Sequence, residues 1–319
     1  MKALLICENL LRYITKGKAL GYVHSVFDNA CNIETNQEFI TLLNSNKGMC
    51  PNSVIVDNEE KLSFTAMGIR KNMVFLFDVN GIRCEEIDLS IRLKNAKSWF
   101  PGLELKEGSM QEEQILDNIK IAEDLIKSHG KLYGMGSFMN IIGDKYRDLN
   151  FIRFPFSDAD NSFGFIEVRL QSFMETFLRG DLDNIDQKAK AIIGFGKGLT
   201  PSIDDFIAGL MISLIYMSSY YNLDVSSIYS FNRKLISQCL DRTTKVSAEM
   251  LKHAAIGEVN EDVRRFMQSL LWEEHKENLK SALMKAISFG ETSGSDTVLG
   301  IYAGCKIITN LKYREAMVK

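Results

Sequence analysis

Residues Gly194–Gly209 read GFGKGLTPSIDDFIAG, a glycine-rich loop that leads directly into a long apolar segment. Three glycines alternate with other residues in this loop: Gly194, Gly196 and Gly198. Glycine allows positive φ angles and lets a ligand approach the backbone closely. Thr200 stands where a helix N-cap is expected, and Pro201 suits the first helical position, where a missing N–H costs nothing. The stretch therefore predicts a buried helix whose N-terminus is suited to binding an anion.

A second stretch, Gly290–Gly300 (GETSGSDTVLG), repeats this pattern. The spacing of Gly198, Thr200 and Asp204 recurs as Gly290, Thr292 and Asp296. In both stretches an apolar helix with small residues follows, and small residues let two helix backbones approach each other. We therefore expect the two helices to pack together, with both N-termini at the opening of one shared ligand site.

Three aspartates are the candidate catalytic residues: Asp204, Asp205 and Asp296. Residues four apart on a helix share a face, and side chains lean toward the N-terminus, so Asp204 and Asp296 are expected to point toward the loops. Asp205 lies about 100° further round the helix, which favours Asp204. Carboxylates suit a ligand that carries N–H groups as well as acidic oxygens, or an intervening cation such as Mg²⁺. The structural alternative is that aspartate in a first turn only stabilises the helix dipole.

Backbone N–H groups and hydroxyls around the two loops are candidates for holding the oxygen atoms of an anion. Lys197 lies among the glycines, and Thr243 and Ser247 are four apart on an expected helix, where ordinary surface polarity is an equal alternative. The full set of candidate substrate- or anion-binding residues is Gly194, Gly196, Lys197, Gly198, Thr200, Ser202, Thr292, Ser293, Gly294, Thr243, Thr244 and Ser247.

Composition is that of a globular protein, with 45% hydrophobic and 25% charged residues and a net charge of −3. Such a mild charge does not favour nucleic acid or an anionic membrane as a partner. The apolar run Phe206–Met217 is shorter than the about 20 residues of a membrane span. Met1–Cys7 is too short for a signal peptide, so a cytoplasmic location with six reduced cysteines is expected. The four histidines lack metal-ligand spacing, which argues against zinc.

The pattern predicts an α+β protein, with a β-rich domain at residues 1–100 and a mainly helical domain at 101–319. The β-rich part is expected to be an antiparallel sheet or small barrel, with an Asn80–Gly81 hairpin. Expected strands are Tyr22–Phe27, Phe39–Leu43, Ser53–Asp57, Leu62–Ala66, Met73–Phe77 and Ile82–Ile87. Expected helices are 111–128, 166–179, 183–192, 201–220, 226–240, 242–256, 260–270, 273–288 and 294–311.

The two glycine stretches resemble the signature segments of the AllH-type family, subunits of oxamate carbamoyltransferase in anaerobic allantoin breakdown. Weaker resemblances extend over much of the chain, at Gly21–Phe27, Pro51–Val54 and Arg242–Glu258. Two residues depart from the family pattern: Lys197 stands where proline is usual, and Ile203 stands where glycine is usual.

The resemblance implies transfer of a carbamoyl group between oxamate or oxalurate and phosphate, in a complex with other subunits or as a homo-oligomer. A non-catalytic subunit that binds a small carboxylate or phosphate is the alternative. A nucleotide-binding P-loop is disfavoured, because Gly194–Thr200 lacks the G-x-x-x-x-G-K-[ST] order. The common Ser-x-Arg-Thr carbamoyltransferase signature is also absent from the sequence.

Overall fold

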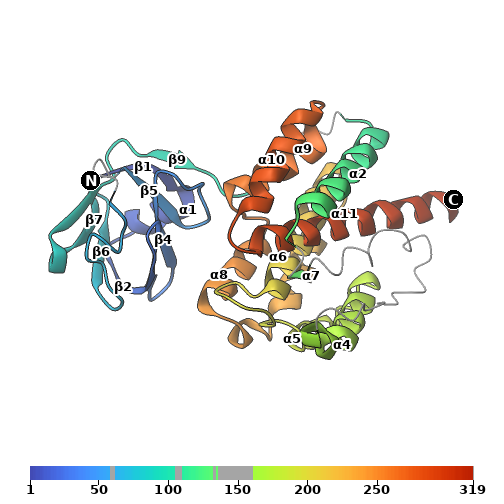
Figure 1. Cartoon of the computed structure of the whole chain (residues 1–319), viewed down its shortest axis with the longest axis horizontal. Helices are drawn as coiled ribbons and strands as arrows, with labels where there is room; N and C mark the ends of the chain where they lie inside the picture. Colours follow the sequence, from blue (N-terminus) through green and yellow to red (C-terminus); the bar gives the residue numbers. More distant parts are fainter. Residues whose placement is uncertain (58–61, 105–109, 132–133, 136–160, 319) are drawn as a thin grey trace. The chain divides into compact units, whose positions relative to one another are not determined.

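The computed structural model describes residues 1–57, 62–104, 110–131, 134–135 and 161–318 (Figure 1). The chain divides into two compact units. The first comprises Met1–Gly102 with Val259–Glu261, and the second comprises Leu103–Glu258 with Asp262–Lys319. The first unit is built mainly from strands and the second from helices, which confirms the expected α+β class.

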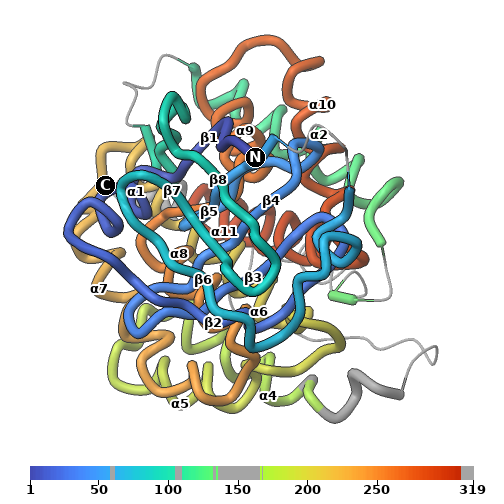
Figure 2. The backbone as a smooth tube through the Cα atoms, turned by 90° about the vertical axis from the view of Figure 1, so that its left-hand side faces the viewer, coloured from blue at the N-terminus to red at the C-terminus, as the bar shows by residue number. Residues whose placement is uncertain are grey.

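Eight strands of the first unit form a closed β-barrel, traced in Figure 2. The order around the ring is β1-β5-β4-β3-β2-β6-β7-β8, and β8 pairs back to β1. A further strand, β9, pairs with β1. The strands are β1 Lys2–Cys7, β2 Ala19–Val26, β3 Ala30–Thr35, β4 Phe39–Asn44, β5 Ser53–Asp57, β6 Val74–Asp78, β7 Gly81–Cys84, β8 Leu89–Arg92 and β9 Lys97–Trp99.

Most strand pairs of the barrel are antiparallel, as expected from the hairpin signals. The exceptions are β4–β5, β1–β8 and β1–β9, which are parallel. The predicted Asn80–Gly81 hairpin is present between β6 and β7, where Asp78 pairs with Gly81. Asp78 Oδ1 accepts hydrogen bonds from the N–H groups of Asn80 (2.8 Å) and Gly81 (3.2 Å), which stabilise the turn.

The barrel core also contains side chains from a short helix, α1 (Glu8–Thr15), through Leu10 and Ile14. The predicted strand Leu62–Ala66 is wrong, because this segment forms a turn. Within it the Ser63 hydroxyl accepts a hydrogen bond from the N–H of Ala66 at 3.1 Å. Phe64 is fully buried in the same core. An apolar side chain that is buried from a turn looks, in the sequence, like one that is buried from a strand, and Phe64 therefore made this segment resemble a strand.

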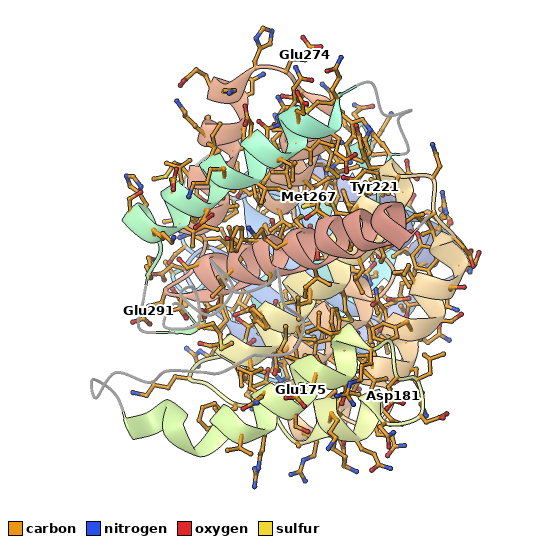
Figure 3. The ribbon with its side chains drawn as sticks, turned by 90° about the vertical axis from the view of Figure 1, so that its right-hand side faces the viewer. Glu175, Asp181, Tyr221, Met267, Glu274 and Glu291 are labelled. Carbon is orange, nitrogen blue, oxygen red and sulfur yellow. The ribbon has the colours of Figure 1, made fainter. Side chains whose placement is uncertain are left out.

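Helices make up the second unit, at nearly the positions expected from the apolar periodicity. They are α2 Glu112–His129, α4 Asn161–Leu178, α5 Ile185–Lys190, α6 Ser202–Tyr220, α7 Val225–Ile236, α8 Lys245–Ala254, α9 Glu261–Trp272, α10 Lys276–Ser288 and α11 Ser293–Val318. A short 3₁₀ helix, Leu240–Arg242, lies between α7 and α8. Figure 3 shows α11 across the middle of the helices, with α2 on one side and α4 on the other.

The two helices that follow the glycine loops, α6 and α11, pack against each other, as expected. Glycines stand where the two backbones approach each other most closely. A Cβ added at Gly209 of α6 would lie 2.1 Å from the carbonyl oxygen of Thr297, and one at Gly300 of α11 would lie 2.0 Å from that of Phe206. Since no side chain fits in these spaces, the glycines are what allow the backbones to meet.

Helix α6 is buried along nearly its whole length. Among the described residues, it is the one helix long and apolar enough by composition to span a membrane, and 94% of its most apolar window is buried inside the protein. The buried core helix of a soluble protein meets the same test, so this composition is weak evidence for a membrane span.

Candidate functional site

The first glycine loop depends on its glycines for backbone conformation and for close contacts. Gly194, Gly196 and Gly198 have φ angles of 86°, 137° and 95°. A Cβ at Gly194 would lie 2.2 Å from the carbonyl oxygen of Arg242, and one at Gly196 would lie 2.3 Å from the nitrogen of Ser202. The structure places the helix N-cap at Pro201, one residue later than the predicted Thr200. The hydroxyl of Thr200 is consequently not used for capping.

The second loop turns at Gly290, which has a φ of 63°. Helix α11 begins at Ser293, and a Cβ at Gly294 would lie 2.1 Å from the carbonyl oxygen of Ala286. The N–H of Gly294 donates to the carbonyl oxygen of Phe289 at 2.9 Å. This corrects the expectation that the Gly294 N–H faces a ligand: Gly294 serves the packing of the helix start.

The two loops meet at one place, as the repeated pattern predicted. The hydroxyl oxygens of Thr200 and Ser293 lie 2.8 Å apart, within hydrogen-bonding distance. Both residues are half-buried, and three nearly inaccessible carboxylates lie close to them, on Asp204, Asp205 and Asp296.

Asp204 is fully buried and is hydrogen-bonded through both carboxylate oxygens. Its Oδ1 accepts from the N–H of Gly194 at 2.7 Å, and its Oδ2 accepts from the hydroxyls of Ser247 (2.6 Å) and Thr243. Burial raises the pKa of Asp204, and these three donors oppose the rise. This arrangement ties the glycine loop to the start of α8.

Asp205 is also buried, with 1% of its surface exposed, but its Oδ2 has no hydrogen-bond partner in the described structure. Burial raises its pKa well above the ordinary value, and the negative charge of Asp296 raises it further. The hydroxyls of Ser293 and Thr200 favour the ionised form and oppose this rise in pKa. Asp205 therefore lies beside the hydroxyl pair that joins the two loops.

Asp296, also 1% exposed, accepts a hydrogen bond at Oδ1 from the N–H of Met135 at 2.6 Å. Its Oδ2, like that of Asp205, is buried with no hydrogen-bond partner among the described residues. Burial raises the pKa of Asp296 to about 6, against opposing contributions from Met135, Ser202 and Thr292. A carboxyl with this pKa exchanges a proton close to neutral pH, which is the property required of a general acid or base.

Three candidate residues near the start of α8 support the first loop. Thr243 and Ser247 donate to Asp204, as described above. Thr244 is the N-cap of α8: its hydroxyl accepts from the N–H of Ser247 at 3.1 Å and donates to the carbonyl oxygen of Leu199. These hydroxyls hold the loop and Asp204 in place.

The remaining candidates differ in accessibility. Lys197 is exposed on the first loop, as are Gly196 and Gly198. Ser202 is buried, whereas Thr292 is half-buried. Within the described ranges, no group of three or more His, Cys, Asp or Glu side chains is arranged to hold a metal ion.

Two parts of the sequence match families of known proteins. Residues 192–305, which contain both glycine loops, match the family described as oxamate carbamoyltransferase subunit AllH. Residues 2–98, which form the barrel, match the AllH family N-terminal domain. The chain belongs to the AllH family. No solved structure matches it.

Membership of the AllH family confirms the resemblance drawn from the two glycine stretches. The family description is that of a carbamoyltransferase subunit, which implies that other subunits take part. The segment matched to AllH also includes Thr243, Thr244 and Ser247, which the structure places around Asp204.

Sequence reasoning missed three contacts beside the second glycine loop, because they come from a distant part of the chain. A Cβ at Gly134 would lie 2.4 Å from Asp296 Oδ1, so only glycine leaves room for that carboxylate. The next residue, Met135, donates the hydrogen bond to Asp296, and Lys131 donates from its N–H to the Ser295 hydroxyl at 2.9 Å. No spacing within the two loops could have indicated these partners.

Proposed function

We propose that this AllH-family chain is a subunit of a carbamoyltransferase, and that the place where its glycine loops meet binds the amide-bearing acceptor. The observation that supports this most directly is the pair of unpartnered buried oxygens, Asp205 Oδ2 and Asp296 Oδ2. A buried polar atom without a partner is costly, unless a ligand supplies the missing hydrogen bond. An amide N–H is a suitable donor.

The proposed reaction joins oxamate to the carbamoyl group of carbamoyl phosphate. The amide nitrogen of oxamate attacks the carbonyl carbon, so a C–N bond forms while the C–O bond to phosphate breaks. The phosphate leaves with the electron pair of that bond, and the nitrogen loses one proton. The products are oxalurate and inorganic phosphate, and the reverse reaction follows the same steps.

In this proposal Asp205 or Asp296 accepts the proton of the nitrogen. The sequence favoured Asp204 for this role, but both oxygens of Asp204 already accept hydrogen bonds from the protein. We therefore assign to Asp204 the positioning of the first loop. The half-buried hydroxyls of Thr200 and Ser293 are suited to orient the acceptor beside the carboxylates.

The second candidate function is a subunit that binds a small carboxylate or phosphate while a partner chain performs the chemistry. The exposed Lys197 and the half-buried hydroxyls of Thr200 and Ser293 favour this alternative, since they suit a small anion without requiring a catalytic carboxylate. The two functions differ in which kinetic parameter the carboxylates affect.

The test is an assay of phosphate release from carbamoyl phosphate and oxamate, using this chain alone and together with its partner subunits. If the proposal is correct, Asp205→Asn and Asp296→Asn lower kcat by about 10²-fold or more in the assembled enzyme, the usual contribution of a general base. A rise in KM with unchanged kcat supports the binding-subunit alternative. Unchanged turnover in both variants contradicts both functions.

A control for this assay is Asp117→Asn. Asp117 lies on α2, where its side chain is 67% exposed and forms a surface ion pair with Lys276. Loss of the Asp117 charge should leave kcat and KM unchanged, because a surface ion pair contributes little to stability.

A further inference from the structure

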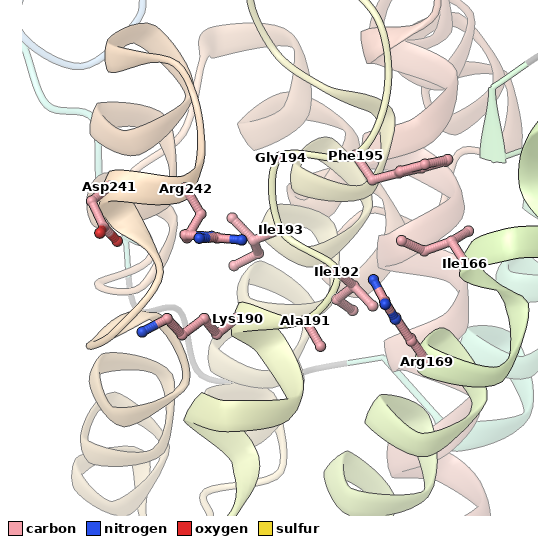
Figure 4. Close-up of a pocket in the computed structure, with 10 residues that line it drawn as sticks. All are labelled: Ile166, Arg169, Lys190, Ala191, Ile192, Ile193, Gly194, Phe195, Asp241 and Arg242. Carbon is pink, nitrogen blue, oxygen red and sulfur yellow. The ribbon is translucent and has the colours of Figure 1, made fainter.

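A cavity of about 450 Å³ lies next to the first glycine loop (Figure 4). It is lined by residues of α4, by the end of α5 with the chain that follows it to Phe195, and by the 3₁₀ helix before α8. Three basic side chains line it, Arg169, Lys190 and Arg242, against a single acidic one, Asp241. We call it the basic cavity.

The basic side chains come from three separate elements and are exposed to solvent. In Figure 4 the side chain of Arg242 extends toward Ile193, and that of Arg169 approaches the neighbouring Ile192 from the other side. Within the part of the chain that the structure describes, neither Lys190 nor Arg242 forms an ion pair. Their positive charges are therefore available to an anionic ligand.

The basic cavity shares a wall with the site of the three aspartates. Gly194 lines the cavity, its N–H donates to Asp204, and it packs against the carbonyl oxygen of Arg242. The residue after Arg242, Thr243, donates its hydroxyl to Asp204. The contacts that fix Asp204 thus also fix the backbone of Arg242 at the edge of the cavity.

We infer that the basic cavity binds a small molecule through a phosphate group. Guanidinium groups are suited to phosphate because their parallel N–H donors match its oxygens. The volume lies within the range of small-molecule sites, and inorganic phosphate fills only part of it, which leaves room for the rest of a phosphorylated ligand. The identification of this ligand as carbamoyl phosphate rests on the proposed function, whereas the phosphate site itself does not.

Titration calorimetry of the full chain with inorganic phosphate, at low ionic strength, tests the inference. Arg242→Gln and Arg169→Gln should each weaken phosphate binding by about tenfold or more, because each removes charge-assisted hydrogen bonds. The matched controls are Arg179→Gln, just beyond α4, and Lys188→Gln on α5, since neither residue lines the cavity. Both should keep the affinity of the unaltered chain.

Three results would overturn the inference: no phosphate binding, equal weakening by the control variants, or unchanged affinity in both cavity variants. A parallel titration with oxamate separates phosphate from carboxylate, and equal affinity for oxamate with the same dependence on Arg242 would overturn the assignment to phosphate. The phosphate site and the proposed reaction can fail separately. If phosphate binding depends on Arg242 but the assembled complex shows no carbamoyl transfer, the site is supported and the reaction is rejected. Transfer with an unchanged KM for carbamoyl phosphate in both cavity variants would exclude the cavity from that reaction.

Discussion

The hydroxyl of Thr200 lies 2.8 Å from the hydroxyl of Ser293, although the two residues belong to different glycine loops. This pair is the point at which the loops meet, and Asp205 lies beside it. Its geometry requires the helices α6 and α11 to start next to each other. That arrangement depends on the glycines at which the two helices touch.

Replacing Gly300 by alanine should therefore destabilise the helical unit. The new Cβ would lie 2.0 Å from the carbonyl oxygen of Phe206, so α6 and α11 must move apart. Overpacking of this kind costs about 1–3 kcal/mol. Urea denaturation measures the loss, and Gly17→Ala is the control, because nothing lies within 4 Å of a Cβ at Gly17. Equal stability of both variants would show that the helices do not need this contact.

Asp204→Asn and Asp205→Asn should affect stability in opposite ways. Asparagine at 204 presents an NH₂ group to hydrogen-bond donors, so the free energy of unfolding should fall by about 1–3 kcal/mol. Asparagine at 205 replaces a buried carboxyl group whose ionised form is disfavoured by burial and whose Oδ2 has no partner, so stability at neutral pH should be unchanged or higher. Thermal or urea denaturation of both variants checks this. A larger loss for Asp205→Asn than for Asp204→Asn contradicts the positioning role of Asp204.

The stability of the protein should depend on pH through Asp296. Burial raises its pKa in the folded state from 3.8 to about 6, so the folded protein holds this proton more tightly than the unfolded chain. The resulting stabilisation is complete below pH 3.8 and is lost as pH rises through about 6. The loss amounts to about 3 kcal/mol when Asp296 is fully ionised.

Urea denaturation of the wild type and of Asp296→Asn, at about pH 5 and about pH 8, measures this contribution. Asparagine retains an oxygen that can accept from Met135, but it cannot ionise. The variant should therefore lose less stability than the wild type between the two pH values. Identical pH dependence of the two proteins would exclude Asp296 as the titrating group.

Thr244→Ala should weaken both α8 and the first glycine loop. The substitution removes the N-cap of α8, which costs about 1 kcal/mol, and it also removes the hydrogen bond to the carbonyl oxygen of Leu199. Hydrogen exchange should become faster in Gly194–Leu199. Asp224→Ala is the matched control, because it removes the N-cap of α7 without a contact to this loop. Thr244→Ser keeps the hydroxyl and should restore slow exchange.

Much of the helical unit could be predicted from its sequence. The start of α6 follows from Thr200, Pro201 and the apolar run, and the matching start of α11 follows from the repeated spacing. The meeting of the loops could also be predicted, because small residues on both helices allow close packing. The partners of the aspartates could not, since helical spacing gives the direction of a side chain and not the atoms that it meets.

The barrel shows the limits of local patterns more clearly. Helix α1 was missed because it is short and follows a strand without a side-chain N-cap. The strands β1, β3, β8 and β9 were also missed, and the parallel pairings of β1 with β8 and β9 join distant parts of the sequence. Phe64 made a turn resemble a strand, because an apolar residue can be buried from either structure.

Strand β1 pairs with β5, β8 and β9, so residues at the beginning of this unit meet residues at its end. Leu5, for example, pairs with Ile55 on one side and with Lys97 on the other. Contacts this distant in sequence require the chain to close long loops before they add stability, and such topologies fold slowly. During synthesis the barrel consequently cannot close until β8 has emerged from the ribosome, and β1 remains without β5 and β8 until those strands have been made.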